Sequence, residues 1–353
     1  MKKLLASVVL MAATPLAIAG GQLHLFNWND YIAEETVTAF EKSCDCQLVQ
    51  DYYSSTEEMM AKLLAGASGY DVVVPTQNAV QALIKQDFLQ ALDKAQLSNL
   101  KNSDPGFLKR SYDPQNTYSV PYAFTTTLVG YNEKRLSELG INPGNWSIIF
   151  DPAVLEKIRG KVTVMDDAEE LFAAALKYLG YSINDQDEKH LREAQKVIMK
   201  AKPYWAAFNS SSYIKELTVG NIWVAHGYSS DMVQARADAE AAARDFTINF
   251  VLPEQGAVLA LDNMVIPKDS KNKTLAHQFI NFMLDGKNAA ALTNEIGAGN
   301  PNKAAAEFID AEIKKQTAIF PDAATLARLE TIEATSAKQR RLLNKLWTEI
   351  KIK

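Results

Sequence analysis

The sequence contains none of the short motifs that mark common catalytic sites. It has no G-x-S-x-G nucleophile elbow, no H-E-x-x-H metalloprotease helix and no phosphate-binding P-loop. Its four histidines are scattered along the chain instead of forming a cluster. The sequence therefore does not indicate an enzyme, and we expect neither catalytic residues nor a cofactor.

Cysteine is also scarce: Cys44 and Cys46 are separated by a single residue. One C-x-C pair supplies two thiolates where a structural zinc site needs four ligands, so we expect no metal. In an oxidising compartment the two sulfurs can close a small disulfide ring in the turn after the first predicted helix. The sequence leaves open whether they do.

The apolar run near the N-terminus, residues 4–13, is far shorter than the roughly 20 residues that span a bilayer. Lys2 and Lys3 precede it, and residues 17–19 fit the small-x-small pattern of a cleavage site. We interpret residues 1–19 as a secretory signal peptide, without a cysteine at the cut to carry a lipid. The mature protein is therefore expected in the periplasm.

Basic residues are fewer than acidic residues. Lysine and arginine number 37 against 42 aspartates and glutamates, which gives a net charge of -5, and loss of Lys2 and Lys3 with the signal peptide makes it more negative. This balance argues against a nucleic-acid partner and is compatible with a cationic ligand.

The length of 353 residues is enough for two domains of roughly 150 residues each. Predicted strands and helices alternate, which favours an α/β fold with a parallel or mixed sheet. We expect strands at 23–27, 48–53, 71–75, 161–165 and 222–225, and helices at 32–40, 57–65, 79–85, 169–178 and 187–200.

The run from residue 118 to 132 is long for one strand, and we expect it to cross between the two domains. The pattern returns to strands from 246 to 267, including 257–260 and 263–266, and the remainder is predicted to be helical up to 338–353.

The predicted strand 23–27 runs directly into Trp28, Asn29 and Asp30. Ligands of open α/β sheets bind beyond the carboxyl ends of the strands. An aromatic face beside a carboxylate suits an organic cation, which the ring attracts by a cation-π contact and the carboxylate by its charge. The alternative is that Trp28 belongs to the core and Asp30 caps the following helix.

Six short motifs occur in an order and spacing that resemble one known family. They are FNWNDYI at 26–32, GYDVVVP at 69–75, VPY at 120–122, GYN at 130–132, AEE at 168–170 and NKAA at 302–305. The chain resembles the periplasmic putrescine/spermidine-binding proteins of ABC transporters from about residue 22 to its C-terminus. The resemblance implies a type II periplasmic binding protein, in which two α/β lobes with mixed sheets are joined by crossing strands around a ligand cleft.

The resemblance also implies a division of the chain and a set of ligand-binding residues. The first lobe is expected to comprise 20–126 plus 259–306, and the second lobe 127–258 plus 307–353. The residues that match the family pattern are Trp28, Asn29, Asp30, Thr76, Glu170, Ser211, Tyr228, Asp231 and Asp262. Four of them are carboxylates, which can pair with ammonium groups spaced along an aliphatic chain. The alternative for each carboxylate is an ordinary solvated surface position.

The chain departs from the family pattern at Ala260 and Ala298, where the family usually has aromatic residues, and at Tyr228, where a tryptophan is common. These departures predict either a wider pocket, which favours triamines over putrescine, or a low affinity for a small diamine. The implied function is capture of a linear polyamine (spermidine, putrescine or a homologue) by a monomeric protein that delivers it to an inner-membrane ABC permease. A polyamine sensor, for norspermidine or spermidine, that signals to an inner-membrane protein is the alternative.

Overall fold

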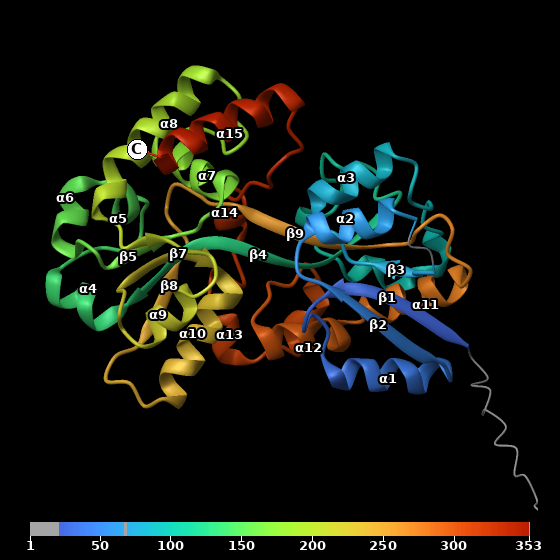
Figure 1. Ribbon diagram of the computed structural model, residues 1–353. Helices are drawn as coiled ribbons and strands as arrows, with labels where there is room; N and C mark the ends of the chain where they lie inside the picture. The colour runs from blue at the N-terminus through green and yellow to red at the C-terminus, as the bar shows by residue number, and fades with distance from the viewer. Residues whose placement is uncertain (1–20, 67–68, 353) are drawn as a thin grey trace, which may run out of the picture.

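The computed structural model describes residues 21–66 and 69–352, so the predicted signal peptide lies outside the described residues. Figure 1 shows two halves, each with strands covered by helices, and long strands that run between the halves. In the described part the strands form a nine-stranded mixed sheet in the order β2-β1-β3-β9-β4-β7-β5-β6, with β8 paired to β4. The strands are β1 (Gln22–Trp28), β2 (Gln47–Tyr53), β3 (Val72–Val73), β4 (Ser119–Asn132), β5 (Val162–Val164), β6 (Ala207–Phe208), β7 (Val224–Tyr228), β8 (Ile248–Val251) and β9 (Leu259–Val265).

Each strand of the described part except β8 is followed by an α-helix, as the sequence predicts for an α/β fold, and runs of successive α-helices follow β4, β5 and β9. The α-helices are α1 (Glu34–Cys44), α2 (Thr56–Leu64), α3 (Gln77–Lys85), α4 (Glu133–Leu139), α5 (Ser147–Phe150), α6 (Pro152–Leu155), α7 (Ala168–Tyr178), α8 (Glu188–Ala201), α9 (Tyr213–Thr218), α10 (Ser229–Ala241), α11 (Lys273–Met283), α12 (Gly286–Ile296), α13 (Ala311–Lys314), α14 (Ala323–Leu326) and α15 (Ala337–Ile352). Within the described ranges, none of them is both long enough and apolar enough to cross a membrane.

Side-chain alternation along β1 divides the core of the first half into two layers. Leu23 and Leu25 face one side and pack in a cluster that includes Phe40 of α1. Phe26 faces the other side and belongs to the cluster that includes Met59 of α2. Because successive residues of a strand point to opposite faces, this pattern places helices on both sides of the sheet.

Strand β4 belongs to both halves of the molecule. Residues 119–126 pair antiparallel with β9, whereas residues 127–132 pair with β7 and β8. Figure 1 shows β4 and β9 side by side at the centre, running from one half toward the other. The long run at 118–132 is therefore a single strand whose hydrogen-bonding partner changes after Thr126. The exact division of the chain into two lobes stays a prediction.

The structure corrects two local expectations. Residues 257–260 and 263–266 are not separate strands, because β9 continues through the polar pair Asp262 and Asn263, both of which are buried. Asp30 does not cap the first helix, since α1 begins at Glu34 with Ala33 at the cap position, and Asp30 adopts a left-handed backbone with φ 51°.

Cys44 and Cys46 form a disulfide at the end of α1. The ring that it closes is too small to remove much conformational entropy from the unfolded chain. We expect the double variant Cys44→Ser/Cys46→Ser to change the free energy of unfolding by about 1 kcal/mol or less. Thermal unfolding of the variant beside the wild-type protein checks this, and a loss above about 2 kcal/mol would contradict it.

Candidate functional site

Asp262 of β9 lies at the centre of a group of aromatic side chains. Its Oδ2 atom accepts a hydrogen bond from the Tyr31 hydroxyl at 2.9 Å. The Tyr122 hydroxyl donates to the Tyr31 carbonyl at 2.7 Å, and the two rings meet at a centroid distance of 5.7 Å. Trp28 stacks at a tilt on Tyr53, with ring centroids 4.5 Å apart. We refer to Trp28, Tyr31, Tyr53, Tyr122 and Asp262 as the Asp262 cluster.

The Asp262 carboxylate is short of positive partners. Burial raises its pKa from 3.8 to about 7, an effect that the Tyr31 hydrogen bond and the Trp28 indole only partly offset. Trp28 Nε1 and Asp262 Oδ1 are both buried, and neither atom has a hydrogen-bond partner among the described residues. One oxygen and one N–H in this cluster thus have no partner among the described residues, and a cation beside the carboxylate would stabilise its charged form.

Glu170 occupies a comparable position in the other half. It lies in the first turn of α7, where Asp167 caps the helix by accepting from the Glu170 amide at 3.0 Å. The Thr127 hydroxyl donates to Glu170 Oε2 at 2.7 Å. Burial raises the pKa of Glu170 to about 8; the Thr127 hydrogen bond lowers it in part, while the charges of Asp167 and Glu169 raise it further.

Asp231 lies near Glu170, in the first turn of α10. Its Oδ2 atom accepts a hydrogen bond from the Tyr213 hydroxyl, and Ser230 donates to Oδ1 at 3.3 Å. Burial raises the Asp231 pKa, and these two hydrogen bonds offset part of the rise. The pKa of the Tyr228 phenol is raised by burial and by the charges of Glu170 and Asp231, among others. Thr127, Glu170, Tyr213, Tyr228 and Asp231 form what we call the Glu170 cluster.

The strand register places the two clusters on the same face of β4. Asp262 lies opposite Ala123, Ala260 opposite Thr125, and Tyr228 opposite Thr127. Cross-strand partners share a face, and so does every second residue of a strand. The two clusters are therefore separated by four residues of β4, or roughly 13 Å. Ala260 and Thr125 lie between them and are partly exposed, whereas their strand neighbours are buried.

Of the other predicted site residues, Thr76 lies beside Asp262, whereas three lie at the surface. The Thr76 backbone forms an isolated bridge with Asp262, and its hydroxyl donates to Asn78 at 2.6 Å. In contrast, Asn29, Asp30 and Ser211 are exposed. The structure thus gathers Trp28, Thr76 and Asp262 in one half and Glu170, Tyr228 and Asp231 in the other, and leaves Asn29, Asp30 and Ser211 outside both clusters.

Sequence reasoning missed five residues of the two clusters: Tyr31, Tyr53, Tyr122, Thr127 and Tyr213. Tyr31 and Tyr122 belong to quoted motifs, so their proximity to other motif residues was an available signal. Thr127 follows Thr125 with the strand period of two, which places it on the ligand face once β4 is recognised as one strand. Tyr213 carries no signal in the sequence, because it reaches Asp231 from a separate helix.

Ala298, expected to widen the pocket, is fully buried in a small cluster with Ala123, Tyr31 and Tyr122. The next residue, Gly299, exchanges two backbone hydrogen bonds with Phe124 at 2.8 and 2.9 Å. A Cβ atom at Gly299 would lie 2.2 Å from the Phe124 ring, so only a glycine lets the loop approach β4 this closely. Since Ala298 packs against Tyr31 and Tyr122, these tyrosines fill the space beside it.

Among the described residues, no group of three or more histidine, cysteine, aspartate or glutamate side chains could hold a metal ion. The two clusters combine buried carboxylates with phenols and an indole, and in them Trp28 Nε1 and Asp262 Oδ1 are buried without a hydrogen-bond partner in the described part of the chain. This donor and acceptor set suits a cation with an apolar body.

The chain as a whole is similar to known proteins. Residues 35–321 match the family model described as bacterial extracellular solute-binding protein. A putrescine/cadaverine-binding protein of Pseudomonas aeruginosa is 66% identical over 353 residues, which is 100% of both chains. A putrescine-binding periplasmic protein of Escherichia coli is 36% identical and aligns over 99% of this chain and 98% of its own.

A solved structure extends the match to the fold. The spermidine/putrescine ABC transporter substrate-binding protein of Streptococcus pneumoniae superimposes with a TM-score of 0.87 at 29% identity, covering 94% of this chain and 99% of that one. The type II periplasmic-binding-protein fold expected from the motifs is confirmed, and these relatives are binding proteins rather than enzymes. The chain belongs to the bacterial extracellular solute-binding protein family.

Proposed function

We propose that this protein binds a linear diamine between the Asp262 cluster and the Glu170 cluster and delivers it to an ABC permease of the inner membrane. The observation that carries the proposal is the pair of buried carboxylates, Asp262 and Glu170, on one face of β4. Among the described residues neither pairs with a lysine or an arginine. Burying a charge without a partner is costly, and the two ammonium groups of a diamine supply the missing partners.

The arrangement of the clusters supports a diamine. Their positions on β4, Ala123 and Thr127, lie on one face and are roughly 13 Å apart along the strand, with the partly exposed Ala260 and Thr125 between them. A short aliphatic chain with an ammonium group at each end can lie over these two residues and reach one carboxylate at each end. Trp28, Tyr31 and Tyr228 supply aromatic faces for the methylenes and the cations.

The same geometry bears on the choice between diamines and triamines. The expectation that triamines bind better rests on extra space at Ala260 and Ala298, and Ala298 is packed against tyrosines. Of these two alanines only Ala260 is partly exposed, and it lies between the clusters beside Thr125. The 66% identical relative is named for putrescine and cadaverine. We therefore propose putrescine or cadaverine as the preferred ligand.

The proposed binding site bridges the two lobes expected from the sequence, which are 20–126 plus 259–306 and 127–258 plus 307–353. Only a conformation that brings both clusters onto one molecule lets the two ends of the ligand be neutralised together. A diamine then favours closure by its differential affinity for that state. In this proposal Asn29, Asp30 and Ser211 form the exposed outer part of the site. After removal of residues 1–19 the protein acts in the periplasm as a monomer.

Calorimetric titration of the mature protein with putrescine, cadaverine, spermidine and an α-amino acid tests the proposal. We expect saturable binding of one diamine per chain, weaker binding of spermidine and no binding of the amino acid. The absence of heat with every polyamine, or tight binding of the amino acid, would contradict the proposed function.

Tyr31→Phe should weaken diamine binding by roughly fivefold. The change removes the hydroxyl that donates to Asp262 Oδ2 at 2.9 Å, so the ionised carboxylate loses about 1 kcal/mol of stabilisation. Tyr52→Phe is the matched control, because Tyr52 precedes Tyr53 on β2 and is exposed. Calorimetric affinities of the two variants should differ; equal affinities would show that the Tyr31 hydroxyl does not position Asp262.

A further inference from the structure

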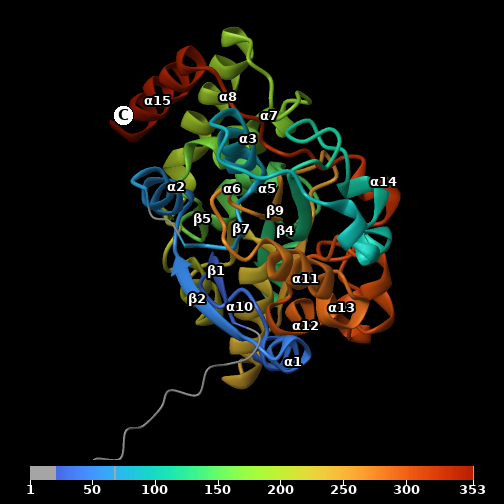
Figure 2. The ribbon, with the colours of Figure 1, turned by 90° about the vertical axis from the view of Figure 1, so that its right-hand side faces the viewer.

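Helices α8 and α15 lie side by side along one edge of the second half of the molecule (Figures 1 and 2). Gln186, just before α8, and Gln339, in the first turn of α15, hydrogen-bond to each other. At the other end Lys202 Nζ, just after α8, donates to the Ile350 carbonyl of α15 at 2.7 Å. Since the two starts meet and the two ends meet, the helices run parallel to each other.

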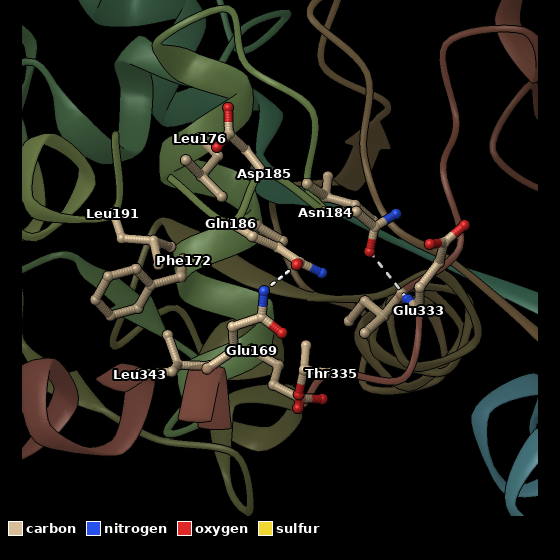
Figure 3. A pocket seen from close by; sticks show the side chains of 14 residues that line it. Glu169, Phe172, Leu176, Asn184, Asp185, Gln186, Leu191, Glu333, Thr335 and Leu343 are labelled. Carbon is tan, nitrogen blue, oxygen red and sulfur yellow. Dashed lines mark hydrogen bonds between the residues drawn. The ribbon is translucent and has the colours of Figure 1, made fainter. Parts of the chain in front are cut away.

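Each of these helices turns apolar side chains toward the interior. Ile198 of α8 and Leu346 of α15 are fully buried. Figure 3 shows Leu191 of α8 and Leu343 of α15 lining one hollow with Phe172 of α7. The inner faces therefore fix both helices to the core, and the opposite faces are left in contact with solvent.

The solvent-facing sides of both helices carry exposed basic side chains. They are Lys189, Lys196 and Lys200 on α8 and Lys338, Arg341 and Lys345 on α15. On each helix the members are three, four or seven residues apart, and such spacings place side chains in a row along one side of a helix. We refer to these six residues as the basic patch.

The two rows of the basic patch belong to one surface. Arg341, Lys345 and Glu349 follow one another at intervals of four residues, so they form one ridge of α15. Glu349 accepts a hydrogen bond from Gln195 Nε2 of α8 at 2.9 Å, so this ridge lies on the side of α15 that adjoins α8. The row on α8 is roughly 16 Å long, and packed helices are about 8 to 10 Å apart. The patch is thus wide enough to meet several anionic groups at once.

The basic patch has no acidic partners of its own. Among the described residues, none of its six side chains forms an ion pair. Two carboxylates on α8 are engaged elsewhere, because Glu188 pairs with Arg192 at 2.7 Å and Glu193 accepts from the Tyr181 hydroxyl at 2.9 Å. This group of unpaired cations contrasts with the net charge of -5 of the whole chain.

We propose that the basic patch is a docking surface for a membrane that contains anionic phospholipid. All but one of its cations are lysines, and the hydrated ammonium on a flexible stem suits a diffuse layer of phosphates. Arginine is the residue preferred for bidentate recognition of a defined carboxylate or phosphate. Clusters of about four to eight basic residues on a helix are typical of proteins that bind anionic lipid.

Docking through the patch is independent of diamine binding, because neither the Asp262 cluster nor the Glu170 cluster contributes a residue to it. Each basic residue close to an anionic membrane strengthens binding by roughly fivefold. The affinity comes from charge, so it falls as salt shortens the range of the attraction.

Co-sedimentation of the mature protein with vesicles tests the proposal. The protein should bind vesicles that contain about 40% phosphatidylglycerol at low salt, and it should not bind vesicles of pure phosphatidylcholine. Raising the salt from about 50 mM to about 500 mM should weaken binding by about tenfold or more. Equal binding to both kinds of vesicle, or binding to neither, would overturn the proposal.

A charge-removing variant locates the surface. Lys338→Gln/Arg341→Gln/Lys345→Gln should weaken binding to the phosphatidylglycerol vesicles by about tenfold or more, with melting temperature and diamine affinity unchanged. The matched control removes the same charge from exposed lysines of the first half. It is the triple variant Lys101→Gln/Lys271→Gln/Lys287→Gln. The control should bind vesicles within about twofold of the wild type. An equal loss in both triple variants would refute the patch, because net charge alone would then set the binding.

The row on α8 provides a second, independent variant. Lys196→Gln/Lys200→Gln should weaken vesicle binding by about fivefold or more. Wild-type binding by this variant and by the α15 variant would refute the surface. Soluble poly-glutamate distinguishes a protein partner from a lipid one: if it binds the patch and vesicles do not, the patch serves an acidic protein and the lipid assignment is wrong.

Discussion

Asp262→Asn should weaken diamine binding by roughly tenfold to more than a hundredfold, or about 1.5 to 3 kcal/mol. The loss has two sources: one charge-assisted hydrogen bond disappears, and an ammonium group of the ligand is left desolvated beside a neutral amide. Glu170→Gln should have a similar effect from the opposite lobe. The change is expected mainly in affinity, since both variants keep the size and shape of the side chain.

The same variants should stabilise the ligand-free protein, and the sign of this effect follows from the pKa. Burial raises the pKa of Asp262 from 3.8 to about 7. The folded state therefore binds the proton more tightly than the unfolded state, so the free energy of unfolding falls as the pH rises from about 4 to about 8. At pH 8 an asparagine avoids this cost, and we expect a gain on the order of 1 to 3 kcal/mol.

Calorimetry and thermal unfolding at pH 8 measure both effects on one protein preparation. Asp269→Asn is the matched control, because Asp269 is an exposed aspartate in the loop after β9. Its affinity and its melting temperature should equal those of the wild type. Undiminished diamine binding by Asp262→Asn would show that the ligand does not reach this carboxylate. A lower melting temperature of the variant would show that burial of the Asp262 charge does not destabilise the folded protein.

Diamine affinity should fall on the order of a hundredfold when the pH is lowered from 8 to 6. In the free protein burial raises the pKa of Asp262 to about 7 and that of Glu170 to about 8. A bound ammonium lowers both pKa values, so binding below pH 8 must release protons. Each carboxyl then costs up to a factor of about ten in affinity for each pH unit below its free pKa.

Titrations at pH 6 and pH 8 check this dependence, and repeating them in buffers of different ionisation enthalpy counts the protons released. Glu170→Gln provides the internal control, because it removes one titrating carboxyl. Its diamine affinity should therefore depend less steeply on pH, and the dependence that remains comes from Asp262 and from any contribution of Asp231. A flat profile, or tighter binding at the lower pH, would mean that the two carboxyls are already ionised in the free protein.

Patterns local in the sequence predicted most of the elements. The run Val72–Val74 is continuous and apolar because β3 lies inside the sheet and both of its faces are buried, with Val73 in one core cluster and Val72 in the other. Strand β9 was divided in two because Asp262 and Asn263 break the apolar pattern. Nothing local shows that these polar residues are held by contacts from far along the chain, namely Tyr31 and Tyr112.

Much of the site is also a product of long-range contacts. Trp28 and Asp262 are 234 positions apart and were linked by family resemblance, not by pattern. Tyr213 reaches Asp231 from a different helix, and Thr127 reaches Glu170 across 43 residues. The sequence could suggest that Ala298 leaves space, but only the tertiary packing shows that Tyr31 and Tyr122 occupy it.

The central claim is that one diamine joins Asp262 in one lobe to the Glu170 cluster in the other. A crystal structure of the mature protein with putrescine or cadaverine tests it most directly. The account predicts a single extended ligand over Ala260 and Thr125, with one ammonium within about 3 Å of Asp262 and the other equally close to Glu170 or Asp231. A ligand bound elsewhere, or one whose nitrogens contact neither lobe's buried carboxylates, would contradict it.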